Sequence, residues 1–423
     1  MLSRHLVAAL CLYGLFSFAC TPSYSQGIED EIVDLEERVT KLERKLRGQE
    51  KKEKAQGETD VLTGVDRVFD DLNVEAAVTF VIQGVNNANG DNVSGGDKWI
   101  SDASYSVDLQ FEKGFDDFAT AFLHLETGDG SGVEDELSLF SNVNRDADDS
   151  DNAVSVTEAW CEYYLQTLPL TLTLGKIDPT CYLDTNDYAN DECTQFLGRM
   201  FRNSPVIEFP DDNAAGVRLL LKPVNSVDIE FQTLEADADW EDVFDDLFFS
   251  CQLNIKSDFS GRTGNYRLYG WLNGKAHTKW TDNSKTNEKG YGAGVSCDQK
   301  LSDTVGIFAR YGWQDADVFI SGENFSLNHA WSMGLQMAGS LWKRDNDIFA
   351  VVFGQVIPSD KYKDANKIKA ESEKHVEAYY SLKVKDHFTF SPDIQIIWDP
   401  FGGDAANGKD TIVVWGMRVQ IDF

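Results

Sequence analysis

Apolar and polar residues alternate with a period of two along most of the chain after Leu72, and the carboxy-terminal segment shows this most clearly. Apolar or aromatic residues occupy every second position there: Val413, Trp415, Met417, Val419, Ile421 and Phe423. The residues between them are small or polar: Val414, Gly416, Arg418, Gln420 and Asp422. Because successive side chains of a β-strand point to opposite faces, this pattern predicts a strand with one apolar face.

The same alternation recurs along the chain and predicts sixteen strands. They lie at 73–84, 101–113, 116–126, 154–165, 170–177, 214–222, 226–235, 246–256, 265–275, 290–300, 303–313, 328–342, 346–356, 373–384, 387–398 and 411–423. Short connections such as 167–169 and 223–225 alternate with long ones such as 127–153 and 178–213. Short turns at one end and long loops at the other are typical of outer-membrane barrels. We therefore predict an all-β fold, a 16-stranded antiparallel transmembrane β-barrel over residues 72–423.

The placement of charge also favours a closed barrel. Lipid offers no hydrogen bonds, so a neighbouring strand must pair every backbone group inside a membrane. The competing fold is a soluble secreted sandwich or propeller, in which the polar strand faces would enclose a dry core. Charged residues would be buried there at a high desolvation cost: Arg218, Glu230, Arg267, Arg310, Glu377 and Arg418. In a water-filled lumen the same residues stay hydrated.

Residues 1–25 have the pattern of an export signal. Arg4 precedes an apolar stretch from Leu6 to Ala19, and small residues follow near Ser25. A single membrane anchor is an alternative that the short apolar stretch disfavours. Lipidation at Cys20 is a second alternative, disfavoured because no Leu lies three residues before it. Export would place the mature chain where disulfides persist.

Residues 26–47 repeat apolar positions in alternating steps of four and three, which predicts a short α-helical coiled coil. The seam consists of Ile28, Ile32, Leu35, Val39, Leu42 and Leu46. The β-branched residues Ile32 and Val39 favour two strands, whereas the segment from Arg38 to Glu43 resembles a known trimerisation pattern, and we favour a homotrimer. An amphipathic helix lying on another domain is the alternative. Residues 48–71 are charged and polar and predict a linker. An even strand number would put the coiled coil in the periplasm.

Composition limits the partners. The chain has 38 Lys and Arg against 71 Asp and Glu, a net charge of 38 − 71 = −33. Phosphate binding needs a cationic face, so nucleic acid is excluded as a partner. After the export signal, no apolar run reaches the roughly 20 residues of a membrane helix, which excludes a helical membrane protein.

The cysteines predict at most two disulfides and no metal site. Five cysteines remain after cleavage of the signal, and Cys181 and Cys193 are the preferred pair because they flank a short segment of a predicted loop. The chain has no CxxC motif and its six histidines are scattered, so neither a metal nor a cofactor is predicted. The Asp-rich stretches 142–152 and 235–246 lack the glycine-containing spacing of a known calcium loop, which favours solvated acidic loops.

Strand parity assigns a mixed set of side chains to the barrel interior. The candidates for lining the pore are Glu158, Trp160, Glu162, Arg218, Arg267, Trp271, Arg310, Glu377, Gln395 and Arg418. Planar polar groups hydrogen-bond sugar hydroxyls in pairs and aromatic faces cover the C–H side of the ring, so this mixture suits sugars. Anion pores use rings of Arg and Lys instead. Alternatively, each inward Arg–Glu pair only holds the barrel wall in shape.

The longest predicted loop that follows a well-patterned strand covers residues 178–213. A short helix within 190–202 would place Arg199 and Arg202 on neighbouring turns, and we predict that this loop folds into the barrel and narrows it. The alternative is an external cap on the barrel mouth. Lys176, just before the loop, falls on the outward parity of its strand, which predicts a bulge near Gly175 or a shifted register.

Several short motifs resemble the carbohydrate-selective porins of the OprB family, over residues from about 72 to 423. They are Glu158-Ala-Trp160, Leu174 to Pro179, Phe209 to Val217, Gly306 to Gln314, Trp331 to Gln336, Glu377 to Tyr380 and Ser391 to Gln395. The resemblance implies a sixteen-stranded outer-membrane barrel that passes mono- and small oligosaccharides by diffusion. It also implies a constriction of Arg, acidic and aromatic side chains, for which the motif residues that point inward are Glu158, Trp160, Arg310, Glu377 and Gln395.

These observations predict a passive, carbohydrate-selective channel in the outer membrane, with small sugars and membrane lipid as partners. A general, weakly cation-preferring porin is the alternative that the negative charge suggests. An outer-membrane hydrolase is a further alternative, because His124 lies near Glu126, although no nucleophile motif accompanies them. In a fourth interpretation the coiled coil tethers the outer membrane to the cell wall, and transport is secondary.

Overall fold

The computed structural model describes residues 72–90, 99–146, 152–320, 325–405 and 410–423. The predicted export signal (1–25), coiled coil (26–47) and linker (48–71) lie outside the described residues and stay predictions. Among the helices of the described ranges, none combines the length and the hydropathy needed to cross a membrane.

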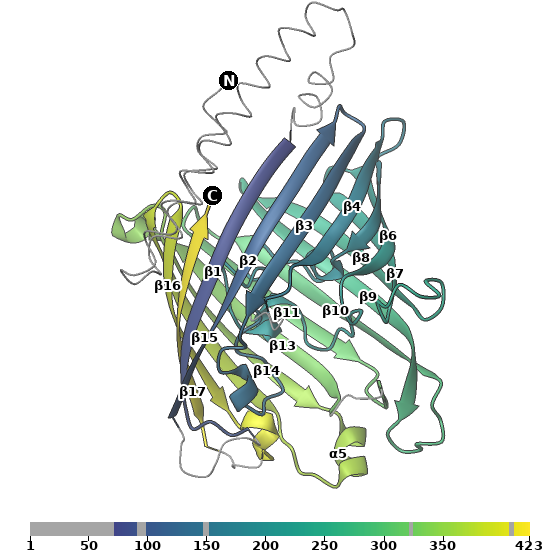
Figure 1. The fold of residues 1–423 in the computed structure, drawn as a ribbon, viewed down its shortest axis with the longest axis vertical. Helices are drawn as coiled ribbons and strands as arrows, with labels where there is room; N and C mark the ends of the chain where they lie inside the picture. The colour runs from purple at the N-terminus through teal and green to yellow at the C-terminus, as the bar shows by residue number, and fades with distance from the viewer. Residues whose placement is uncertain (1–71, 91–98, 147–151, 321–324, 406–409) are drawn as a thin grey trace, which may run out of the picture. The chain divides into compact units, whose positions relative to one another are not determined.

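All strands of the described residues join one antiparallel sheet, which closes because β1 pairs with β17 as well as with β2 (Figure 1). The strands are β1 (Leu72–Asn86), β2 (Trp99–Phe115), β3 (Ala119–Asp129), β4 (Ser155–Leu165), β5 (Leu170–Ile177), β6 (Ala214–Val224), β7 (Val227–Glu235), β8 (Leu247–Phe259), β9 (Arg262–Lys279), β10 (Glu288–Lys300), β11 (Val305–Gln314), β12 (Val318–Ile320), β13 (Leu327–Ala338), β14 (Ile348–Pro358), β15 (Glu373–Lys385), β16 (Phe388–Trp398) and β17 (Ile412–Asp422). Closure gives the wall strands a partner on each side, as a lipid environment requires.

Sixteen of these strands form the wall of the barrel, which confirms the predicted number. The additional strand, β12, has three residues and lies in the loop after β11, where it pairs with the last residues of β9. It was not predicted, because three residues are too few for a period-two pattern to be recognised.

The connections follow the predicted alternation of short turns and long loops. Tight turns join β2 to β3, β4 to β5 and β6 to β7, whereas the loops after β3, β5 and β14 are long. Short helices occupy several connections: η1 (Glu134–Glu136), η2 (Pro179–Cys181), α4 (Arg199–Arg202), η3 (Gly339–Trp342), α5 (Asp360–Asn366) and η4 (Pro400–Gly403). Strand β13 ends at Ala338 instead of the predicted 342, because η3 begins at Gly339. A Cβ on Gly339 would lie only 2.0 Å from the carbonyl oxygen of Arg344.

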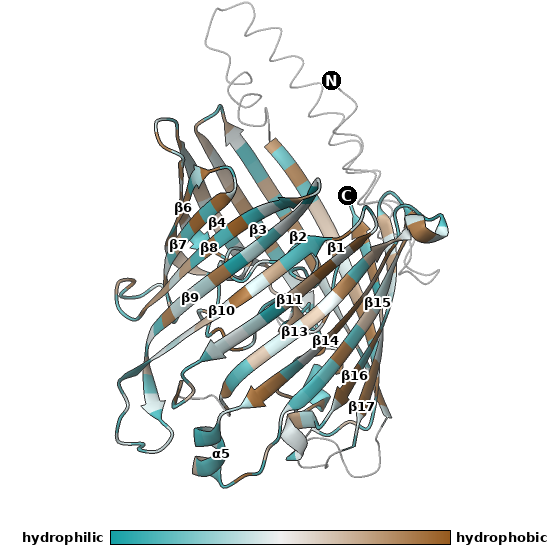
Figure 2. Cartoon of the chain, turned by 180° about the vertical axis from the view of Figure 1, so that it is seen from behind, coloured by the Kyte–Doolittle hydropathy of each residue, from teal (hydrophilic) through white to brown (hydrophobic). Residues whose placement is uncertain are grey.

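The two faces of the wall differ as the alternation predicts. On β9, Leu268 is 57% exposed on the outside, whereas Arg267 and Tyr269 on the inside are 6% and 2% exposed. Figure 2 shows the same alternation of hydrophobic and hydrophilic residues along the strands. The outer surface also has an apolar groove of about 410 Å³ over β6–β9, bordered by Leu219 and Phe231. Large apolar side chains are exposed on other strands too, such as Ile82 of β1 and Met333 of β13. A soluble monomer rarely exposes so many apolar side chains together, so this face suits lipid.

The predicted bulge near Gly175 is not found. The pairing of β5 with β4 and with β6 runs without interruption through Gly175. Gly175 instead has a φ of 144°, and a Cβ there would lie 2.6 Å from the Cα of Trp160. The register shift falls one strand earlier, where Leu125 of β3 pairs with Val156 instead of Thr157.

Two long loops fold into the barrel and fill part of its interior. From residues 178–213, Phe196, Met200 and Phe201 pack against wall residues of β11 and β13–β15 in one buried apolar cluster. The loop between β3 and β4 contributes Phe140 to the same cluster. We name residues 178–213 the inward loop.

Candidate functional site in the barrel lumen

Arg310 of β11 anchors the inward loop to the wall. Its Nη1 donates to the carbonyl oxygen of Phe201 (2.6 Å), and its Nη2 donates to the carbonyl oxygen of Asp184 (2.9 Å) and to Oδ1 of Asn190 (3.2 Å). The Asp184 carboxylate lies 3.2 Å from Nε of Arg310. Burial raises the pKa of Asp184 to about 6, although Arg310 opposes the shift. This guanidinium therefore binds loop backbone from the inner face of the wall.

Glu377 and Arg418 hold the middle of the same loop, at residues 192–198. Both carboxylate oxygens of Glu377 accept hydrogen bonds from backbone amides, Leu197 at 2.6 Å and Gly198 at 2.9 Å. Arg418 of β17 donates to the carbonyl oxygen of Glu192 (2.6 Å). Both side chains are buried, with Glu377 0% and Arg418 2% exposed.

Gln395 binds the other loop. Its Nε2 donates to the carbonyl oxygen of Val143 (2.9 Å), which belongs to the β3–β4 connection, and to Asp393 (3.0 Å). Its Oε1 lies 3.1 Å from Nε2 of His375. Four of the predicted pore residues thus contact loop backbone: Arg310, Glu377, Gln395 and Arg418.

Arg202 is the buried cation within the inward loop. It forms an ion pair with Glu192 and lies 3.5 Å from Asp178, while its Nη1 donates to Oγ1 of Thr180 (2.6 Å). Burial opposes the ionisation of Asp178, but Arg202 and the Thr180 hydrogen bonds outweigh it and lower the pKa of Asp178. Arg199, which was predicted to belong to the constriction together with Arg202, is exposed.

Glu158 and Trp160 lie together on β4, where Oε2 of Glu158 accepts a hydrogen bond from the Asp178 amide (3.4 Å) at the start of the inward loop. The indole Nε1 donates to Oε2 of Glu158 (3.0 Å), and the indole ring stacks on Phe122 with centroids 4.9 Å apart. Glu158 lies 4.0 Å from His124. His124, which the hydrolase hypothesis invokes, forms a 2.8 Å hydrogen bond with Asp108.

Arg218 of β6 joins two carboxylates and a loop aromatic. Its Nε lies 2.6 Å from Glu230 and its Nη1 lies 3.0 Å from Glu162, which also accepts from Thr173. The guanidinium carbon lies 4.1 Å above the ring centroid of Tyr182. This arrangement presents donors, acceptors and an aromatic ring within one short stretch of the lumen.

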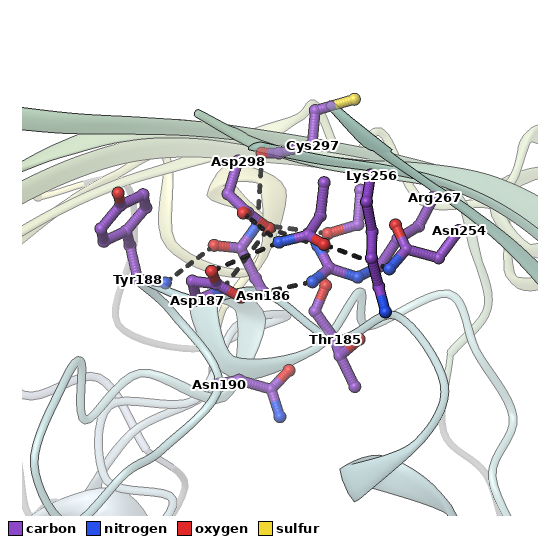
Figure 3. Close-up of polar contacts among 12 residues, drawn as sticks. Thr185, Asn186, Asp187, Tyr188, Asn190, Asn254, Lys256, Arg267, Cys297 and Asp298 are labelled. Carbon is purple, nitrogen blue, oxygen red and sulfur yellow. Dashed lines mark hydrogen bonds and ion pairs between the residues drawn. The ribbon is translucent and has the colours of Figure 1, made fainter. Parts of the chain in front are cut away.

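Arg267 of β9 occupies a second cluster of the same kind (Figure 3). It forms an ion pair with Asp298 of β10 and lies 3.4 Å from Asp187 of the inward loop. Asn265 donates to Asp298 at 2.9 Å. Asp187 is exposed, so part of this cluster faces water. In Figure 3 the loop residues Thr185 to Asn190 lie opposite the wall residues of β8–β10.

A cleft between the inward loop and the inner wall of β6–β9 connects the Arg218 and Arg267 clusters. Its volume is about 190 Å³, which is room for about six water molecules at ~30 Å³ each. It is lined by Cys181, Tyr182, Thr185, Arg218, Leu220, Lys222, Asp228, Glu230, Gln252, Asn254 and Arg267. We call it the loop–wall cleft and treat it as the candidate site.

Only some of the predicted pore-lining residues lie at the loop–wall cleft. Arg218 and Arg267 line the cleft, and Glu162 contacts Arg218. Trp271 lies elsewhere, 4% exposed, in an apolar cluster with Phe248. The inward face of Asp298 follows from the parity of β10, whereas no pattern in the sequence marks Tyr182, because it lies in a loop.

The predicted Cys181–Cys193 disulfide is not formed. The Cys181 thiol donates to Asp178 (3.1 Å) and the Cys193 thiol donates to Asp146 (3.2 Å). All five cysteines of the described residues are free thiols. Nearness in sequence did not bring the two thiols together, because each one contacts a different carboxylate.

A closed antiparallel barrel with an apolar outer face and a loop folded into its lumen defines this protein as a porin. The family model described as "Carbohydrate-selective porin, OprB family" matches residues 101–423, so the chain belongs to that family, which implies an outer-membrane location.

Known structures agree on the fold. The high-pH structure of OprB from Pseudomonas putida has a TM-score of 0.70 and 14% identity, covering 85% of this chain and 96% of that one. The outer-membrane channel DcaP of Acinetobacter baumannii has a TM-score of 0.53 and 15% identity, covering 83% and 97%. An uncharacterized protein of Aquifex aeolicus (strain VF5) is 26% identical over 196 residues, 44% of this chain. The match spans about half of that relative, 54%.

Proposed function

We propose that this porin lets small sugars diffuse passively across the outer membrane, past a constriction that the inward loop forms against the wall of β6–β9. The observation that carries the proposal is the loop–wall cleft, where two guanidinium–carboxylate clusters and the Tyr182 ring lie within one small polar space. Family membership supports a carbohydrate as the solute.

The cleft suits sugars because it offers hydrogen bonds in both directions. Arg218 and Arg267 donate, whereas Glu230 and Asp228 accept, and Asn254 does both. A sugar hydroxyl both donates and accepts, so it exchanges water for these groups at little cost. Arg310, Glu377, Gln395 and Arg418 then act by holding the loops in place, and Glu158 and Trp160 support the start of the inward loop.

Liposome swelling tests the channel. Vesicles with the purified protein should swell in arabinose or glucose faster than protein-free vesicles, and sugars that enter no faster than the protein-free rate refute the proposal. In planar bilayers, glucose should reduce the current of the wild type. Tyr182→Ala should weaken this block by several-fold, whereas Tyr188→Ala, a matched change in the same loop outside the cleft, should leave it unchanged.

A general, weakly cation-preferring porin is the second candidate. The net charge of −33 and the 56% exposed side chain of Asp187 beside the cleft favour it. Reversal potentials under a KCl gradient distinguish the two: a cation preference without any glucose block supports the general porin.

For the amino-terminal region, we propose export by residues 1–25, a homotrimeric periplasmic coiled coil at 26–47 and a linker at 48–71. The heptad seam supports this proposal. Cross-linking of the full chain should yield trimers that a chain lacking residues 26–60 does not form. Pull-down on purified peptidoglycan, with both chains, tests whether the segment also contacts the cell wall.

A further inference from the structure

The loop between β7 and β8 gathers carboxylates at one end of the barrel, away from the loop–wall cleft. Glu235, the last residue of β7, pairs with Leu247, the first residue of β8. The Ala236 amide donates to the carbonyl oxygen of Asp246 (3.2 Å). Residues 236–246 therefore form a closed loop whose two ends are fixed by the sheet.

Three alternate residues of this segment converge. The carboxylate oxygens of Glu235, Asp237 and Asp239 lie within 4.8 Å of one another. Like charges at this distance repel, so the arrangement has an electrostatic cost. Lys289 forms an ion pair with this loop, but its Nζ lies 3.3 Å from Asp246, which is not one of the three converging carboxylates.

The buried state of Glu235 is a separate observation that points to a ligand. Its side chain is 1% exposed, and neither buried carboxylate oxygen has a hydrogen-bond partner among the described residues. The Trp240 amide and the Asp239 side chain approach this carboxylate from the same loop, but neither completes a hydrogen bond to it. A buried carboxylate without a partner is costly, and a bound cation would offset that cost.

The donor set selects the kind of cation. All three groups are carboxylates, the oxygen ligands of a hard ion such as Ca²⁺ rather than of Zn²⁺. Counted from Glu235, they occupy positions 1, 3 and 5, the first ligand positions of a twelve-residue calcium loop, and Asp246 occupies position 12. Such loops have a glycine at position 6 to make a sharp turn. Here position 6 is Trp240, whose φ is 66°, so the backbone adopts the left-handed turn without glycine.

We propose that Glu235, Asp237 and Asp239 form a Ca²⁺ site that fixes the β7–β8 loop at the long-loop end of the barrel. Half-buried Asp237 and exposed Asp239 would bring the ion to the buried Glu235 carboxylate. The site is independent of sugar passage, because its residues do not line the loop–wall cleft.

Terbium luminescence tests the site, because Trp240 lies next to Asp239 and would sensitise a bound lanthanide. The full-length protein in detergent is freed of metal with a chelator and titrated with Tb³⁺. Excitation of tryptophan should produce Tb³⁺ emission that Ca²⁺ displaces. Asp237→Asn with Asp239→Asn should weaken Ca²⁺ binding at least tenfold. Asp242→Asn, which removes the same charge type from the same loop outside the trio, should change it less than twofold.

Calorimetric titration with Ca²⁺ alone provides a second readout. Trp240→Phe should abolish most of the emission and leave the calorimetric affinity within a few-fold of the wild type. The single variant Glu235→Gln should weaken binding and shows whether the buried carboxylate is a ligand; a heat-modifiability gel confirms that each variant is folded. The proposal fails if Ca²⁺ displaces no emission at millimolar concentrations, or if the double variant binds Ca²⁺ as the wild type does.

Discussion

Arg310 of β11 and Asp184 of the inward loop form a buried ion pair, with Nε 3.2 Å from Oδ2 and side chains 1% and 0% exposed. The same guanidinium donates to the backbone carbonyl oxygens of Asp184 and Phe201. Arg310 thereby fixes the position of two separate parts of the loop. A substitution at Arg310 is therefore the most direct way to test whether the loop narrows the pore.

Arg310→Met should release the inward loop from the wall. Breaking a buried pair by removing one partner costs about 3–5 kcal/mol, because the remaining charge is left uncompensated. We expect higher single-channel conductance and less discrimination between small and large sugars in liposome swelling. Arg344→Met is the control, because Arg344 also pairs with an aspartate, Asp347, but at a short turn outside the lumen and with its side chain 48% exposed. Unchanged conductance in Arg310→Met would show that the loop holds its position without this pair.

Glu377→Gln should loosen the middle of the inward loop. The variant keeps the shape but replaces one of the two acceptors of the Leu197 and Gly198 amides by a donor. Hydrogen bonds to charged groups contribute about 1.5–3 kcal/mol each. Trypsin should therefore cleave after Arg199 or Arg202 several-fold faster than in the wild type. Glu371→Gln, an exposed position after α5, should leave the cleavage rate unchanged; equal rates in both variants would contradict the assigned role of Glu377.

Asp146 should make the stability of the barrel depend on pH. Burial raises the pKa of Asp146 to about 8, against the ordinary value of 3.8, with Cys193 and Ser106 hydrogen-bonded to it. Between about pH 4 and pH 8 the folded state then binds more protons at this site than the unfolded state. Stability therefore falls as the pH rises through that window, by at most about 1.4 kcal/mol per pH unit.

Thermal midpoints at pH 5, 6.5 and 8 in one detergent measure this slope. The wild type should lose more stability over the series than Asp146→Asn, in which the titrating group is absent. Asp135→Asn, an exposed aspartate in the same loop, should keep the wild-type slope. Parallel curves for the wild type and Asp146→Asn would show that Asp146 ionises without disturbing the fold.

Cys181 and Cys193 should both react as free thiols in unreduced protein. Each contacts its own carboxylate, Asp178 or Asp146, and not the other thiol. Burial raises the pKa of both thiols and slows their reaction in the folded state, so the protein is alkylated in denaturant without reductant. Peptide mass spectrometry should then find the adduct on both cysteines. A peptide pair linked through Cys181 and Cys193 would contradict the structure.

Much of the barrel could be predicted from the sequence because its physical rule is local. Side chains alternate across a strand, so parity alone placed Arg267 inside the barrel. The lengths of the connections predicted short turns at one end of the barrel and long loops at the other. The strand β12 was not predicted, because three residues are too few to show an alternating pattern. The bulge predicted at Gly175 is absent, and this was not predicted, because the positive φ of a single residue does not change the alternation of the sequence.

The proposed calcium site also depends on a backbone conformation that the sequence pattern did not predict, at Trp240. The stretch 235–246 lacks the glycine of a calcium loop, so its sequence indicates a solvated acidic loop. In the structure Trp240 adopts the left-handed conformation that glycine would supply, in a loop whose two ends are paired in the sheet at Glu235 and Leu247.

By itself, the sequence determined the strands, their inward and outward faces and the family, since each depends on neighbours a few residues apart. Only the tertiary structure decided what the inward residues contact. Glu377 meets Leu197 across 180 residues of chain, and Arg418 meets Glu192 across 226. Parity shows that such side chains point into the barrel. Whether they contact water, sugar or loop backbone there depends on where a long loop packs. That packing is determined by contacts between parts of the chain that are distant in sequence.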